Sequence, residues 1–283
     1  MLTLSFMRHA FVASTFIAII CGIIGVFVVA RNLSFLTHTL SEIGFAGGAF
    51  AVFAGWPALN GMILFTMLSS VIVGQMSIKE SRREAVISAV SALFIGLGIL
   101  FLSLSSQSAS SATSILFGSV VGISLNEVWQ LVYLSILVLI ILLLMYRRLK
   151  FDSFDSIGAQ VSGINQTVIS VIFLLLLALS VSVAAQIVGS LLIFILLTLP
   201  AASAKYFTHG VARMIILAIL FSLLGTWLGL FLGYLTDWPL SSLVTFLPSV
   251  SSDGFFSFDV FSPSVLSFSF VVFLSFPDSL AGF

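Results

Sequence analysis

The apolar residues of this chain fall into long, uninterrupted runs separated by short polar segments. A helix needs roughly 20 apolar residues to cross a hydrocarbon core about 30 Å thick, and several uncharged runs approach or reach that length. The runs do not alternate apolar and polar residues as barrel strands do. We therefore predict an all-α fold, a polytopic transmembrane helical bundle of about 8 to 9 spans. The predicted spans are 10–30, 39–55, 58–76, 84–104, 128–146, 167–185, 187–204 and 212–235, with one or two marginal segments after 239.

Charge is scarce in this sequence. Only 7% of its 283 residues are charged, 60% are hydrophobic, and the mean hydropathy is +1.28. Soluble domains carry about 25% charged residues, so the composition indicates a protein surrounded by membrane lipid. The net charge of zero leaves no basic surface for nucleic acid, which we exclude as a partner. The single cysteine, Cys21, lies in the first apolar run and is interpreted as a small buried residue.

The few basic residues indicate an orientation. If successive spans alternate, nine of the ten lie on one side of the membrane and only Arg8 lies on the other. Because cytoplasmic loops are rich in Lys and Arg, we predict a multi-pass protein whose N-terminus lies outside. The nine residues on the predicted cytoplasmic side are Arg31, Lys79, Arg82, Arg83, Arg147, Arg148, Lys150, Lys205 and Arg213.

Ionisable residues inside a membrane span are costly and therefore point to function. His38 and Glu42 stand four residues apart near the start of the second span, so both side chains lie on one face of a helix. An imidazole and a carboxylate suit Zn²⁺, Mn²⁺ or Fe²⁺, and a site with so few ligands would release its ion readily. Two ligands do not select one metal. The alternative is that the two residues only hydrogen-bond each other at a helix start.

Motifs of common enzymes are absent from the sequence. It contains no phosphate-binding G-x-x-x-x-G-K-[ST] loop, no H-E-x-x-H and no G-x-S-x-G. No pair of intramembrane aspartates suggests a protease within the membrane. We expect no enzymatic activity of the chain itself and no permanently bound cofactor.

A polar loop at 147–166 follows the fifth predicted span. Asp155 or Ser156 is expected to cap a short helix there, and Gly163 to end it. The alternative is an ordinary connecting turn that lies in the membrane interface.

Several segments, in order along residues 10–248, resemble the membrane-spanning permease of the zinc/manganese group of bacterial ABC importers. In that family an Arg follows the first span, and the next helix carries Asp-x-x-x-His; here Arg31 precedes His38 and Glu42, with acid and imidazole exchanged. The other similar segments are Leu-Phe-Gly-x-x-x-Gly-Ile at 116–123, the loop helix at 154–163, Val-Gly at 188–189 and Pro-Ala-Ala-x-Ala at 200–204.

The resemblance implies a site, partners and a mechanism. It places His38 and Glu42 at the family's metal-binding positions. It also implies that the loop helix couples the permease to an ATPase through Asp155, Ser156, Ala159 and Gly163, although Ser156-Ile157 stands where the family has Pro-Glu. Such permeases pair with a second copy of themselves, with cytoplasmic ATP-binding subunits and with an extracellular metal-binding protein. The chain would then import manganese or zinc, or else iron, across the bacterial plasma membrane by alternating access.

Two other functions stay open at this point. An ion-coupled secondary transporter of a small solute would need charges at mid-span and inverted repeats, and neither is visible. A non-catalytic structural membrane subunit would need no site at all.

The end of the chain differs in composition. We divide the chain into a permease domain, 1–250, and a tail, 251–283, in which 18 of 33 residues are Ser or Phe. Because Ser and Phe codons differ by a single base, one hypothesis is that the tail is read out of frame. The alternative is a genuine divergent end.

Overall fold

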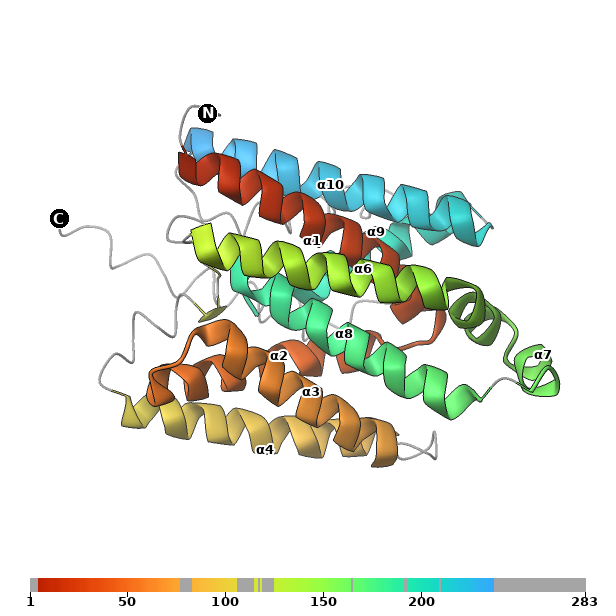
Figure 1. The fold of residues 1–283 in the computed structure, drawn as a ribbon, viewed down its shortest axis with the longest axis horizontal. Coiled ribbons are helices and arrows are strands. Elements are labelled where there is room, and N and C mark those ends of the chain that lie inside the picture. The colour runs from red at the N-terminus through yellow and green to blue at the C-terminus, as the bar shows by residue number, and fades with distance from the viewer. Residues whose placement is uncertain are drawn as a thin grey trace. The chain divides into compact units, whose positions relative to one another are not determined.

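The computed structural model describes residues 5–76, 83–105, 115–116, 118, 125–163, 165–190, 193–208 and 210–236. The chain divides into two units, Met1–Pro248 and Ser249–Phe283, and every described residue belongs to the first. The marginal segments after 239, the tail and the out-of-frame hypothesis therefore lie outside the described residues. The helices (Figure 1) are α1 (Ser5–Ala30), α2 (Ser34–Ala54), α3 (Ala58–Met76), α4 (Arg83–Leu104), α6 (Leu125–Phe154), α7 (Ser156–Val161), α8 (Gln166–Val188), α9 (Ile193–Phe207) and α10 (Val211–Thr236).

Each of the eight predicted spans is a helix, which confirms the all-α bundle. Six helices are long and apolar enough to cross a membrane: α1, α3, α4, α6, α8 and α10. Helix α2 has the length but carries His38 and Glu42 among its Ser, Thr and Gly residues. Helix α9 has 15 residues and extends about 22 Å, less than the thickness of the hydrocarbon core. The orientation with the N-terminus outside stays a prediction from the charges.

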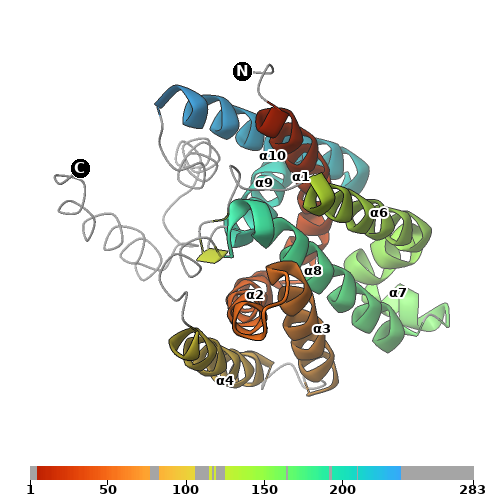
Figure 2. The ribbon, with the colours of Figure 1, turned by 60° about the vertical axis from the view of Figure 1, so that its left-hand side comes forward.

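Helix α2 packs against α3 and α4 over most of its length and also touches α8 and α9. A second group of contacts joins α1 to α10, α9 and α6, and α8 packs against both α3 and α6. Figures 1 and 2 both show α8 between the helices of these two groups. Small residues permit the closest approach: a Cβ on Gly47 of α2 or on Gly61 of α3 would meet the backbone oxygen of the other.

The turn between α1 and α2 is fixed by Arg31. Its Nη2 lies 2.6 Å from Oδ2 of Asp152, its Nε donates to Ser153 Oγ at 2.7 Å, and its guanidinium lies over the ring of Phe173 at 4.9 Å. Asp152 and Ser153 belong to the end of α6, and Phe173 belongs to α8. The start of α2 is thereby fixed to the end of α6, directly before α7.

Most of the described basic residues lie at one end of the bundle, which we call the basic end. It is the end where α1, α6 and α9 finish and where α2, α4, α8 and α10 begin. Figure 1 shows α7 beyond the helices at this end. Besides Arg31 it holds Arg147, Arg148, Lys150, Lys205 and Arg213.

Candidate metal site

The first half of helix α2 is largely buried except for one accessible stripe. Phe35, His38, Glu42 and Phe45 are partly or largely accessible, whereas the residues between them are buried. The spacing of three, four and three residues places these four side chains on one face of the helix. The stripe therefore places both predicted ligands on the same accessible surface. Glu42 lies about 12 Å along α2 from its first residue.

The two predicted ligands are close enough to share one ion. Nδ1 of His38 lies 3.6 Å from Oε1 of Glu42, and the side chains are 44% and 37% accessible. Two ligand atoms each about 2.1 Å from a tetrahedral metal are about 3.4 Å apart, so the pair fits one ion with little movement. The 3.6 Å separation is longer than an ordinary hydrogen bond, and the alternative that the two residues only bind each other stays open beside the metal-site prediction.

Neighbouring helices hold both ligands in place. Ser91 of α4 donates a hydrogen bond of 2.9 Å to Oε2 of Glu42, and Ser91 is itself buried. The ring of Phe194, at the start of α9, meets the His38 imidazole edge to face at a centroid distance of 5.3 Å. Ser91 and Phe194 could not be predicted as neighbours of the pair, because they lie 49 or more positions away and nothing in their spacing marks them.

In the part of the chain that the structure describes, the predicted site has only two ligand side chains. Among the described residues no group of three or more His, Cys, Asp and Glu side chains could hold an ion. A carboxylate that faced lipid near the centre of a bilayer would cost about 3 kcal/mol on insertion scales. The accessible stripe of α2 is therefore suited to face water or another protein surface.

The predicted loop helix forms, as α7. The Asp155 side chain caps it and accepts a hydrogen bond of 2.9 Å from the backbone N–H of Gly158, and Ser156 is its first residue. Gly163 follows the helix with φ of 74°, a left-handed conformation that glycine adopts without strain. Ala159 is fully buried. The plain connecting turn is therefore wrong, whereas the coupling role of these residues stays a prediction.

The outer face of α7 is apolar. Ile157 and Val161 stand four residues apart on one face and are 76% and 84% accessible. Since α7 lies beyond the basic end of the bundle, this face is available to a partner outside the spans (Figure 1).

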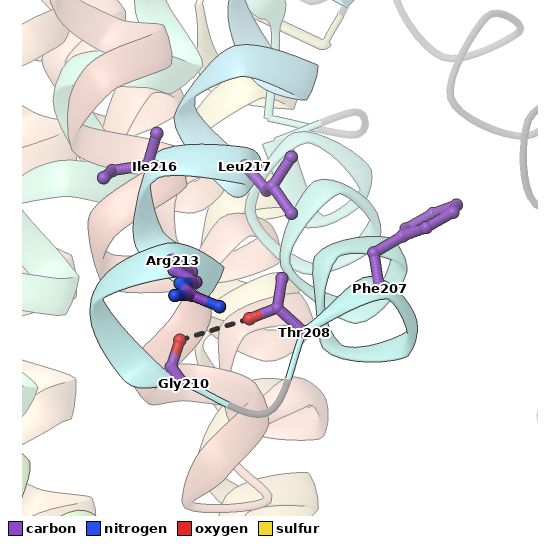
Figure 3. A pocket seen from close by; sticks show the side chains of 6 residues that line it. All are labelled: Phe207, Thr208, Gly210, Arg213, Ile216 and Leu217. Atoms are coloured by element: carbon purple, nitrogen blue, oxygen red, sulfur yellow. Dashed lines mark hydrogen bonds between the residues drawn. The ribbon is translucent and has the colours of Figure 1, made fainter.

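A hollow in the turn between α9 and α10 does not resemble a metal site. Figure 3 shows Arg213 beside the bond from the Thr208 hydroxyl to the carbonyl of Gly210, at 3.2 Å. Among the described residues that line the hollow the others are apolar, and none carries a carboxylate or an imidazole. The hollow is lined by Phe207, Thr208, Gly210, Arg213, Ile216 and Leu217.

Comparisons with known proteins assign the chain to a family. Residues 3–251 match the ABC 3 transport family. The chain is 28% identical over 232 residues to the manganese transport system membrane protein MntC of Listeria monocytogenes, covering 82% of each protein. It is 26% identical over 246 residues to the manganese import system permease protein ScaB of Streptococcus parasanguinis, covering 87% of this chain and 88% of ScaB.

The fold is shared with a solved structure. PsaBC from Streptococcus pneumoniae in complex with Fab superposes with a TM-score of 0.78 at 25% identity, covering 87% of this chain and 89% of the other. The family match covers most of the sequence, and the described helices have the same fold as this relative. The chain is therefore a member of the ABC 3 transport family.

Proposed function

We propose that the chain is the membrane permease subunit of an ATP-driven importer that carries a divalent metal ion, with Mn²⁺ as the first choice and Zn²⁺ as the second. The observation that carries this proposal is the pair His38 and Glu42 on the accessible stripe of α2. Membership of the family supports the transport function, and the names of the relatives support manganese. ATP hydrolysis belongs to a separate subunit.

Two copies of the chain would complete the site. A two-fold axis along the accessible stripes of two α2 helices would bring together two imidazole nitrogens and two carboxylate groups. Four such ligands suit Mn²⁺ or Zn²⁺ and leave neither Glu42 exposed to lipid. Because the ligands come from two subunits that move relative to each other, the site can form and open during each cycle. Such an open site favours release of the ion, as transport requires.

The geometry also suggests how an ATPase would move the site. The apolar face of α7, with Ile157 and Val161, would bind a cytoplasmic ATP-binding subunit. Movement of α7 passes to the end of α6, where Asp152 holds Arg31 at 2.6 Å, and Arg31 lies three residues before α2. The ligands on α2 would then face alternate sides of the membrane as the ATPases close and open. An extracellular metal-binding protein would deliver the ion.

A test compares metal content in cells. A strain lacking the gene and strains restored with wild-type, His38→Ala or Glu42→Ala genes are grown under metal limitation, and Mn, Zn and Fe are measured by mass spectrometry. We expect wild type to restore one metal and both variants to restore none, with unchanged protein in the membrane. Phe35→Ala is the matched control, because Phe35 lies on the same stripe and cannot ligate a metal. Restoration by both alanine variants would refute the proposed site.

A further inference from the structure

We propose that Ser91 is a positioning residue that makes Glu42 a one-oxygen ligand and thereby selects Mn²⁺ against Ca²⁺. This inference rests on the proposed function, because it concerns how the same carboxylate binds the transported ion. It adds a residue on another helix, α4, and assigns it a role in selectivity.

The two oxygens of Glu42 have different surroundings. Oε2 accepts the hydrogen bond of 2.9 Å from the Ser91 hydroxyl, whereas Oε1 points to His38, whose Nδ1 lies 3.6 Å away. Ser91 is only 5% accessible, so its hydroxyl has little access to water as an alternative partner. One oxygen of Glu42 is therefore bound to the scaffold, and the other is free to meet an ion beside the imidazole.

The bond from Ser91 differs from the bonds that most other described hydroxyl groups in the bundle donate, although Thr66 and Ser182 also share a bond between two helices. Serine and threonine in membrane helices usually donate to the carbonyl one turn earlier in their own helix. Ser180 does so to Leu176 at 2.7 Å, and Thr198 does so to Phe194 at 2.7 Å. Ser91 instead donates to a carboxylate on another helix, 49 residues away in the chain.

Close packing of α4 on α2 keeps this bond in place. A Cβ on Gly98 of α4 would lie 2.7 Å from the Cα of Ala46 on α2, so the two backbones touch there without an intervening side chain. Ala46 lies one turn beyond Glu42, and Gly98 lies two turns beyond Ser91. The serine and the carboxylate are therefore fixed relative to each other by backbone contact and not by side chains alone.

A carboxylate held in this way disfavours Ca²⁺. Calcium takes 6–8 oxygen ligands at about 2.3–2.6 Å and often binds both oxygens of one carboxylate. Smaller transition-metal ions accept one carboxylate oxygen together with imidazole nitrogen at about 2.0–2.2 Å. The Ser91 hydroxyl takes one of the lone pairs of Oε2 and fixes the orientation of the carboxylate, so the two-oxygen mode is disfavoured relative to binding through Oε1. Hydrogen-bond partners of ligands typically change metal affinity by about 10–100-fold when they are removed.

The test measures metal binding by the purified full-length chain in detergent. The electron paramagnetic resonance signal of free Mn²⁺ reports the bound fraction, and added Ca²⁺ reports competition. For Ser91→Ala we expect Mn²⁺ affinity to fall by about 10-fold or more and Ca²⁺ to compete better than in wild type. Ser91→Thr keeps the hydroxyl and should restore both values. Ser88→Ala, on the accessible side of α4 one turn away, is the matched control and should behave as wild type.

The outcomes separate this inference from the proposed function. If Glu42→Ala loses Mn²⁺ binding and uptake while Ser91→Ala equals wild type in Mn²⁺ affinity and in Ca²⁺ competition, the positioning role is wrong and the metal site stands. If Ser91→Ala weakens binding of both ions equally, Ser91 has a merely structural role and the selectivity claim is also wrong. If Glu42→Ala binds and transports Mn²⁺ like wild type, the proposed site is wrong and this inference fails with it.

Discussion

The close contact between α2 and α4 predicts opposite effects for two glycines of the same helix. In Gly98→Ala the new methyl group would lie 2.7 Å from Cα and 2.8 Å from Cβ of Ala46, whereas ordinary contacts begin at 3.4 Å. The shortfall of about 0.7 Å falls on backbone, which cannot rotate away, so the helices must separate. In Gly96→Ala the methyl group meets nothing within 4 Å.

The expected magnitudes follow from packing and helix propensity. The free energy of unfolding of both variants should rise by up to about 1 kcal/mol, because alanine has a higher helix propensity than glycine. Gly98→Ala also loses about 1–3 kcal/mol to overpacking, and this term alone separates the two variants. At roughly 2–4 °C per kcal/mol, the melting temperature of Gly98→Ala should lie roughly 2–12 °C below that of Gly96→Ala.

The chain contains its own reporter for this measurement. Cys21 is the single cysteine of the sequence and is fully buried in α1, so a thiol-reactive fluorophore should label it only as the protein unfolds. Each variant is heated in detergent with the dye, and the midpoint of labelling is compared. A midpoint for Gly98→Ala equal to or above that of Gly96→Ala would refute the close contact of α2 with α4.

Two further predictions concern the basic end and the ligand pair. Arg31→Ala leaves the carboxylate of Asp152, which is only 7% accessible, without its cation, and should lower the free energy of unfolding by about 3–5 kcal/mol. The same thiol-labelling scan should show a lower midpoint for this variant than for the control, Lys150→Ala, which changes an exposed residue at the same helix end. Equal midpoints for the two variants would contradict the ion pair. The double variant His38→Asp with Glu42→His restores the family's order of acid and imidazole and should keep metal uptake in cells. Each single change instead leaves two carboxylates or two imidazoles per chain and should reduce uptake. Loss of uptake in the double variant despite normal membrane levels would contradict interchangeable ligands.

Hydropathy located the helices of this chain but not all of their ends. The second span was expected from residue 39, whereas α2 begins at Ser34, because its first turns carry Thr37 and His38 and are too polar to register as membrane-spanning. The fifth was expected to end at 146, whereas α6 continues to Phe154, since a charged segment outside the bilayer can still be helical. Apolarity reports where a helix crosses lipid, and the helix itself extends further.

The break between the sixth and seventh predicted spans lies later than expected. It was placed between 185 and 187, but α8 continues to Val188 and stops at Gly189, which has φ of 93° and ψ of 148°. That conformation suits glycine alone, so the residue type marked the break better than hydropathy did. Helix α9 then starts at Ile193 and stays short, which brings Phe194 beside His38.

The candidate ligands His38 and Glu42 could be predicted because they are four residues apart. Ser91, the hydrogen-bond partner of Glu42, could not be predicted. Spacing of four residues defines a shared helix face without any knowledge of the fold. The bond from Ser91 to Glu42 depends on how α4 lies against α2, which depends in turn on the absence of a side chain at Gly98. Local periodicity contains no information about such contacts between helices.

The distribution of polar residues on α2 supports a functional reading over a purely structural one. On its buried faces Thr37, Thr39 and Ser41 donate to carbonyls of their own helix, Leu33, Leu36 and His38, and thus need no other partner. An imidazole and a carboxylate cannot be satisfied in that way, and a fold selected for stability alone would bury them against partners or replace them. Here they occupy the accessible stripe along the first half of the helix. The stripe is therefore costly in a single chain, and an ion bound between two copies is the arrangement that would offset that cost.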